Sequence, residues 1–231
     1  MTNSALHEAE REARDEAAPI VVLVAVVLIA LALVSMHANW RLFHGVGWWL
    51  WLLAAVPYLA LAAVLVAGPT RVRDSAHRRR MVQALLVVIV VCSLVQMSML
   101  VASLLASSSL GISGPQLLGS GVTLWFSNVV AFGLAFWELD CGGPVRRALS
   151  ATRSAPDIQF PQDDNPSLAR PGWAPHLLDY LYVSTTNSIA FSPTDAMPLT
   201  LPTKGLMAIE SAVSVVTVLL IAARAVNILH V

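Results

Sequence analysis

The sequence predicts an all-α membrane protein, a polytopic bundle of six transmembrane helices in one domain. Of its 231 residues, 57% are hydrophobic and only 12% are charged. Roughly a quarter of the residues of a soluble domain are charged, so this chain has too few charges to cover a soluble fold. Several separate apolar runs also reach about 20 residues, the length that a helix rising about 1.5 Å per residue needs to cross the hydrocarbon layer.

The first apolar run, Pro19–Met36, is predicted to be a membrane anchor that stays in the protein. A cleavable signal peptide starts with a basic segment and ends at a small-residue cleavage site. Residues 1–17 instead hold more carboxylates than arginines, and no such site follows before His37. We therefore expect residues 1–17 to be a cytoplasmic tail, as a short surface helix or a disordered segment, and residues 18–231 to be a single transmembrane domain.

Further runs satisfy the length requirement along the rest of the chain. Three of them are strongly apolar: Val46–Ala67, Met81–Ser107 and Gln116–Trp137. Lys204–Ile228 meets the requirement although it contains Glu210. These runs predict the second, third, fourth and last helices of the bundle.

The fifth segment, His176–Ser192, is the weak one, because it is short and rich in hydroxyl and amide side chains. It either spans the membrane or enters it and turns back. Arginines collect in cytoplasmic loops, and the loop Thr70–Arg80 holds five of them. This bias places both that loop and the polar loop 138–175 in the cytoplasm. Six spans then put both termini in the cytoplasm, whereas a re-entrant fifth segment carries Arg224 towards the outer face.

A few polar side chains lie inside the predicted spans, and they define a candidate site. Such groups are costly in lipid unless paired, so they are expected to face the bundle interior. Helical spacing puts Glu210 on one stripe with Ser214 and Thr217, which either lines a path for an ion or makes hydrogen bonds between helices. The candidate residues are Glu210, Asn128, Asn187, Gln96 and Thr186.

Glu210 is expected to have a hydrogen-bond donor inside the bundle. The candidate donors are Asn128, Gln96 and the hydroxyl of Thr185 or Thr186. We also expect the fifth segment to be helical and to contact the last helix, because the connection between them is short.

The connection Phe191–Thr203 contains three prolines, which restrict it to extended and turn conformations. Within it, Asp195 is either a carboxylate at an outer mouth or a solvated residue of a tight loop.

No catalytic motif is present: the sequence has no Walker lysine loop, no GxSxG elbow and no HExxH. Cys92 and Cys141 cannot form a metal site by themselves and predict no disulfide framework. A formal net charge of zero offers no attraction to nucleic acid. We therefore expect a non-enzymatic protein of the cell membrane, without metal or cofactor, whose partners are the lipid bilayer and, as a candidate, further copies of the same chain.

Three stretches of the C-terminal half carry a family resemblance. They are WFSNVVAFGLAFWELDCGGPVRRAL (Trp125–Leu149), DIQFPQ (Asp157–Gln162) and DYLYVSTTNSIAFSPTDAMPLT (Asp179–Thr200). They resemble an uncharacterised group of small bacterial membrane proteins with a domain of unknown function. The resemblance implies a polytopic protein of the bacterial inner membrane and no known activity.

A looser resemblance concerns Asp179–Arg224, which is similar in layout to the pore module of potassium channels. Tyr180–Ser188 stands in the place of the pore helix and Met207–Val226 in the place of the inner helix. The family's TVGYG filter is absent, and AFSPT at 190–194 occupies its position. A proline there would disturb the rings of carbonyls that bind potassium, and the charge bias puts the preceding connection on the inside, whereas the channel layout needs it outside.

Together these observations favour a protein that passes or senses a small ion or solute. The alternative is a structural or partner-binding subunit of a membrane assembly, and a membrane-embedded enzyme is the third possibility. A passage requires polar residues from several helices to converge, whereas an enzyme requires acid, base or metal-binding groups within hydrogen-bond reach.

Overall fold

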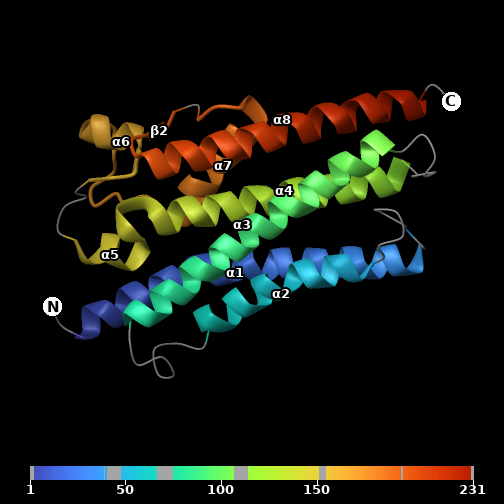
Figure 1. Cartoon of the computed structure of the whole chain (residues 1–231). Coiled ribbons are helices and arrows are strands. Elements are labelled where there is room, and N and C mark those ends of the chain that lie inside the picture. The colour runs from blue at the N-terminus through green and yellow to red at the C-terminus, as the bar shows by residue number, and fades with distance from the viewer. Residues whose placement is uncertain are drawn as a thin grey trace.

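The computed structural model describes residues 3–38, 40, 48–66, 75–106, 114–150, 155–193 and 195–229. Five long helices run side by side along the molecule (Figure 1): α1 (Asn3–His37), α2 (Trp49–Val66), α3 (Ser75–Ala106), α4 (Gly114–Leu139) and α8 (Leu201–Leu229). Each is long and apolar enough to cross a membrane. The prediction of an all-α protein is confirmed, and these five helices fit a multi-pass membrane protein.

Most of the short elements gather at the end of the bundle where α1 begins (Figure 1). Two short strands pair there in antiparallel fashion, with Ile158 opposite Pro198 and Gln159 opposite Met197. The short elements are η1 (Asp140–Gly142), α5 (Pro144–Leu149), β1 (Ile158–Gln159), α6 (Pro161–Asp164), η2 (Pro166–Leu168), α7 (Leu177–Ala190) and β2 (Met197–Pro198).

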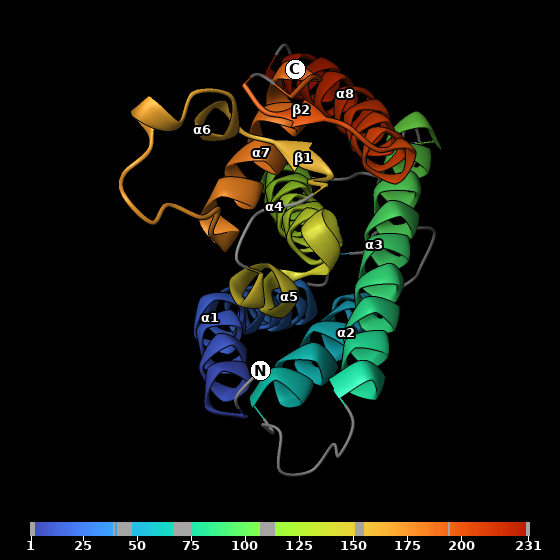
Figure 2. The ribbon, with the colours of Figure 1, turned by 90° about the vertical axis from the view of Figure 1, so that its left-hand side faces the viewer.

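Helix α4 lies at the centre of the bundle, as the view along the helices shows (Figure 2). It packs against α1, α3, α7 and α8. Many of its large side chains are therefore buried, among them Phe132 and Phe136, whose ring centroids lie 6.2 Å apart. The polar residues of α4 consequently face other helices.

Residues 3–17, which belong to the segment predicted to be a cytoplasmic tail, form the first turns of α1. Alanines four residues apart, Ala9, Ala13 and Ala17, are buried along this segment, which packs against α5. Glu16 accepts hydrogen bonds from the backbone N–H of Leu177 at 3.0 Å and lies 2.7 Å from Nδ1 of His176. The start of α1 therefore holds the start of α7.

The predicted helix over His176–Phe191 is confirmed as α7, but α7 has only 14 residues and is not among the five candidate spans. The chain on both sides of it returns to one place, because β1 precedes α7, β2 follows it, and the two strands pair. The described residues therefore contain five candidate spans, whereas the sequence predicted six.

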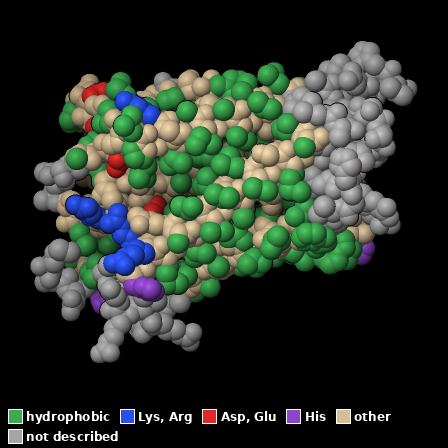
Figure 3. Space-filling model, in the orientation of Figure 1, with side chains coloured by type: hydrophobic (Ala, Val, Ile, Leu, Met, Phe, Trp, Pro, Cys, Tyr) green, Lys and Arg blue, Asp and Glu red, His purple; other side chains and the backbone are tan. Residues whose placement is uncertain are grey.

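The surface is divided between an apolar band and a charged end. On the face seen in Figure 3, the charged side chains gather at the end where α1 begins, and the middle of the bundle carries none. Large apolar side chains such as Val87 and Val122 are each 63% exposed. Side chains of this kind are stable in contact with lipid, so the band matches the hydrocarbon layer of a membrane.

Candidate functional site

The predicted polar stripe of α8 faces the interior of the bundle. Glu210, Ser214 and Thr217 are spaced by four and three residues, and all three are fully buried. Residues at this spacing share one face of a helix, and that face of α8 packs against α3, α4 and α7. The expectation that Glu210 faces the bundle is confirmed. The side chain of Arg224 lies outside the described residues.

Glu210 is bonded by two neutral side chains of α7. One carboxylate oxygen accepts a hydrogen bond from the hydroxyl of Ser184, and the other accepts from Nδ2 of Asn187 at 2.7 Å. These residues lie three apart on α7, so a single helix face presents both donors to α8. Of the described Lys, Arg and His side chains, none forms an ion pair with Glu210.

The same hydroxyl of Ser184 also lies 2.8 Å from the backbone carbonyl of Val129 on α4. Asn187 extends the network, since its Nδ2 donates to the carbonyl of Met207 at 3.0 Å and its Oδ1 accepts from Ser211 at 2.9 Å. The central helix, α7 and α8 therefore meet at Glu210. The Ser184 hydroxyl and the Val129 carbonyl that it contacts supply oxygen atoms, the ligand type that hard cations prefer, whereas Asn187 presents its amide nitrogen to the carboxylate.

The donors that the sequence suggested for Glu210 are not the ones that bind it. The hydroxyls of Thr185 and Thr186 bond to carbonyls of their own helix, at 2.7 and 3.0 Å. Gln96 is half-buried on α3 and makes no hydrogen bond to Glu210. Ser184 was not predicted as a donor because it is one of several hydroxyl residues in this segment, and its role depends on which face of the 14-residue helix α7 meets α8.

Asn128 is fully buried beside Val129 on α4, and neither its amide oxygen nor its amide nitrogen has a hydrogen-bond partner in the described part of the chain. The hydroxyls of Ser127 and Ser214 are likewise buried without a partner among the described residues. A buried polar group without a partner costs about 1–3 kcal/mol. Together, these groups place unused hydrogen-bonding capacity inside the bundle, on α4 and α8.

Glycines allow α4 to approach its two polar neighbours closely. A Cβ atom at Gly133 would lie 3.1 Å from Cα of Leu181 and 2.6 Å from its Cδ2, so α7 touches α4 there through its backbone. A Cβ atom at Gly121 would lie 2.6 Å from Cδ1 of Ile221 on α8. The approach at Gly133 is the stricter of the two, because backbone cannot move aside as the end of a side chain can.

Asp195 is exposed and lies in the connection between α7 and β2. Since Met197, two residues later, pairs with Gln159 of the loop 138–175, Asp195 belongs to the same end of the bundle as that loop. The structure therefore does not place Asp195 at a mouth on the opposite side from this loop, where the six-span arrangement would have put it.

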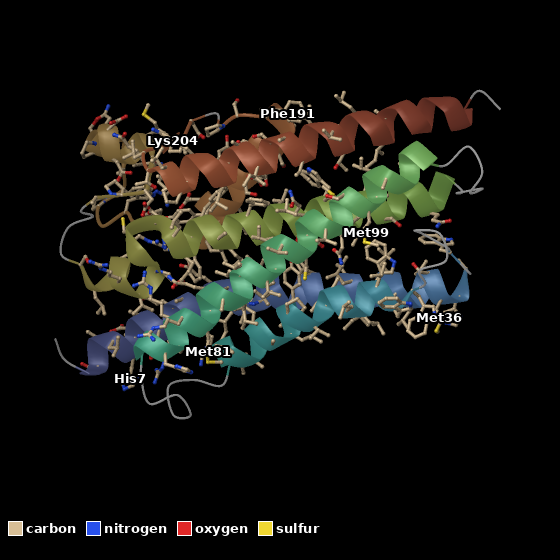
Figure 4. All side chains as sticks on the ribbon, viewed as in Figure 1. His7, Met36, Met81, Met99, Phe191 and Lys204 are labelled. Carbon is tan, nitrogen blue, oxygen red and sulfur yellow. The ribbon has the colours of Figure 1, made fainter. Side chains whose placement is uncertain are left out.

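Figure 4 shows how far α7 reaches. Phe191, which follows its last residue, lies along the bundle between Lys204 and Met99. Phe191 adopts a left-handed conformation with φ of 57°, and such a residue commonly ends a helix and redirects the chain. Helix α7 thus ends at Phe191 partway along the bundle, and the chain then returns to β2.

A second buried carboxylate, Asp140, organises the short elements at the end of the bundle. Its Oδ1 accepts hydrogen bonds from the backbone N–H groups of Asp157, at 2.7 Å, and Ile158, at 3.1 Å. Its Oδ2 accepts from the hydroxyl of Tyr180 at 2.5 Å and lies 3.9 Å from Nη1 of Arg147. Asp140 therefore ties the end of α4 to β1 and to α7.

Two neighbours complete this network. Arg147 donates to the carbonyls of Trp137 and Asp140 at 2.9 and 2.8 Å, and its guanidinium lies 5.0 Å from the ring centroid of Tyr180. The carboxylate of Asp157 accepts from the N–H of Cys141 and from the hydroxyl of Thr200. All of these residues fall in the stretches Trp125–Leu149, Asp157–Gln162 and Asp179–Thr200, so hydrogen bonds join these three stretches at this end of the bundle.

Comparison of the chain with protein-family models, with curated proteins and with solved structures found no match.

Proposed function

We propose that this protein is a multi-pass membrane protein that passes or senses a small cation, including a proton, at Glu210. The observation that carries the proposal is a fully buried carboxylate whose bonds, among the described residues, come only from the neutral side chains of Ser184 and Asn187. A negative charge inside a membrane costs several kcal/mol unless a counter-ion, a proton or water accompanies it. Because no described basic side chain supplies that charge, a mobile cation is the natural partner.

The surroundings of Glu210 support an exchangeable cation. The Val129 carbonyl and the Ser184 hydroxyl present oxygen atoms beside the carboxylate. Asn128, next to Val129, and Ser214, one turn further along α8, have polar atoms that no described residue satisfies. Buried polar groups without a described partner therefore occur on both α4 and α8, the helices that meet α7 at Glu210.

The alternative is a structural or partner-binding subunit in which Glu210 only holds α7 against α8. It is favoured by the fact that both carboxylate oxygens already accept a hydrogen bond. The two functions differ in whether the carboxylate needs to ionise, because a purely structural acceptor does not.

We also infer a topology of five spans and one re-entrant segment. At about 1.5 Å per residue, 14 residues of α7 extend about 21 Å, less than the roughly 30 Å of a hydrocarbon core, and the paired strands β1 and β2 bring both of its flanks to one end. With the arginine-rich end in the cytoplasm, this topology puts the N-terminus inside and the C-terminus outside. An impermeant thiol reagent should then label a cysteine introduced after α8 in intact cells, and protection of that cysteine would restore the six-span topology.

The test of function is flux through purified protein in liposomes containing a pH-sensitive or a sodium- or potassium-sensitive dye. Glu210→Gln keeps the size of the side chain and much of its hydrogen bonding but cannot ionise. We expect the wild type to conduct and Glu210→Gln to abolish the flux while the protein remains folded. Glu8→Gln, which removes the same charge from an exposed position on α1, is the matched control and should conduct normally.

The proposal would be overturned if the wild-type protein showed no flux for any of these ions and no change in spectrum or stability when the ions are added. Flux that survives Glu210→Gln would exclude Glu210 as its site and favour the structural alternative for this residue.

A further inference from the structure

A second site lies at the charged end, away from Glu210. A cavity of about 660 Å³ opens there between α1, the start of α3 and the turn that leads into α5. Its charged lining consists of four arginines, Arg78, Arg79, Arg80 and Arg146, and two glutamates, Glu10 and Glu138. Four positive charges against two negative ones leave the cavity with a formal excess of two positive charges.

The two glutamates each form an ion pair with one of the arginines. Arg78 lies 3.0 Å from Glu10 and is nearly buried, and Arg79 lies 3.7 Å from Glu138. Arg80 and Arg146 form no ion pair with any described carboxylate. The excess charge of the cavity is therefore carried by two side chains that are available to a ligand.

Gly142 brings guanidinium groups together at one point of this cavity. A Cβ atom built on Gly142 would lie 3.1 Å from Nη1 of Arg146 and 3.3 Å from Nη2 of Arg79. Gly142 also has a φ of 78°, a conformation that favours glycine. Arg79 already has Glu138 as its partner, so the unpaired guanidinium at this point is that of Arg146. Guanidinium groups match the geometry of phosphate oxygens.

An apolar groove adjoins the cavity on the side of the membrane band. It has a volume of about 330 Å³, and it shares Gln83 and Glu138 with the cavity. Its walls are almost wholly aliphatic and include Leu86 and Val87 of α3 and Leu206 of α8. The two hollows together thus offer a cationic part at the end of the bundle and an aliphatic part within the apolar band.

From this arrangement we infer that the cavity binds the phosphate headgroup of an anionic phospholipid whose acyl chain lies in the groove between α3, α4 and α8. Basic pockets between membrane helices recognise such headgroups. A free phosphate would use the arginines but not the groove. The site needs only the membrane placement of the bundle, and it does not depend on the function of Glu210.

Lipid binding can be measured by native mass spectrometry of the detergent-purified protein, titrated with dioleoyl phosphatidylglycerol or dioleoyl phosphatidylcholine. The wild type should bind the anionic lipid more tightly than the zwitterionic one, although their acyl chains are identical. A basic residue contributes about fivefold to such binding, so Arg80→Gln with Arg146→Gln should weaken phosphatidylglycerol binding about 25-fold. Arg11→Gln, at an exposed position of α1 outside the cavity, should change it little.

The groove has its own matched pair of variants. Val87→Trp, which fills the groove, should weaken binding of phosphatidylglycerol, whereas Val122→Trp, at a position of equal 63% exposure on α4, should not. Competition on the wild-type protein requires no variant: glycerol phosphate should displace the lipid only at far higher concentration.

Equal binding of the two lipids by the wild type would overturn the inference. So would a loss in the double arginine variant no larger than that in Arg11→Gln. Displacement by glycerol phosphate or inorganic phosphate at lipid-like concentrations would also overturn it, because the groove would then contribute nothing and the ligand would be a soluble phosphate.

Discussion

Two fully buried carboxylates, Asp140 and Glu210, are treated very differently within the same bundle. Asp140 accepts two backbone N–H groups and a tyrosine hydroxyl, and the guanidinium of Arg147 lies beside it. Among the residues that the structure describes, Glu210 accepts only from the serine hydroxyl and asparagine amide of α7. The first carboxylate has a fixed countercharge from Arg147, and the second has none from any basic side chain that the structure describes.

This difference separates a structural acid from one that is suited to a mobile ligand. A buried ion pair with satisfied hydrogen bonds holds its partners in one arrangement, and removing one member leaves the other charged and unpaired. A buried acid with neutral partners leaves no such charge behind when it is altered. The replacement of a carboxylate by its amide should therefore destabilise the protein much more at Asp140 than at Glu210.

The largest effect is expected for Asp140→Asn. The change leaves the guanidinium of Arg147, whose side chain is only 7% exposed, without its countercharge, and removes acceptor strength from three hydrogen bonds. Breaking a buried pair in this way costs about 3–5 kcal/mol, which reversible unfolding in mixed micelles with a denaturing detergent would measure. Asp15→Asn, which breaks the surface pair with Arg14, should cost less than about 1 kcal/mol.

A double variant sharpens this prediction. Asp140→Asn combined with Arg147→Met removes both charges and should recover part of the lost stability. If Asp140→Asn is as harmless as Asp15→Asn, the countercharge of Arg147 does not matter, and the contrast with Glu210 disappears.

An intermediate effect is expected where α7 meets α4. Gly133→Ala forces a methyl group against the backbone of Leu181, and such overpacking costs about 1–3 kcal/mol. Gly121→Ala meets only the end of the Ile221 side chain, which can rotate, so the better helix propensity of alanine should leave that variant neutral or slightly stabilised. Equal losses for both variants would show that α7 and α8 are held against α4 with the same rigidity.

The smallest effect on stability is expected for Glu210→Gln. The Gln side chain still accepts one hydrogen bond, and no buried cation is left without a partner, so the free energy of unfolding should fall by about 1 kcal/mol or less. The same detergent unfolding measures it. A loss as large as that of Asp140→Asn would reveal a countercharge at Glu210 and remove the basis for a mobile cation there.

Much of the bundle was predictable because apolar runs report on local structure. Each of the five long apolar runs corresponds to one long helix. The largest difference is at Pro19–Met36, which covers only the second half of its helix because α1 begins at Asn3. The charged turns before Pro19 form part of that helix because alanines at every fourth position pack against the neighbouring elements, a pattern that hydropathy alone does not reveal.

The candidate site was predictable in part, and for the same reason. Glu210 and Asn187 stand out as polar residues in membrane segments, and the structure joins them by a hydrogen bond. The network around Asp140 was missed because its partners, Asp157 and Tyr180, are 17 and 40 residues away in the sequence. The course of the chain after α7 was equally hidden, because it depends on the pairing of two strands of two residues each.

Because α7 ends partway along the bundle, its helix dipole affects the electrostatic potential inside the membrane. A helix carries a partial positive charge at its first turn and a partial negative charge at its last, from carbonyls that have no partner within the helix. Helix α7 starts at the charged end beside Glu16 and ends at Phe191 partway along the bundle. Its negative pole is therefore the deep one, near Asn187. The field that it adds at mid-depth attracts positive ions and repels negative ones, as half-helices do in transporters that bind sodium or protons.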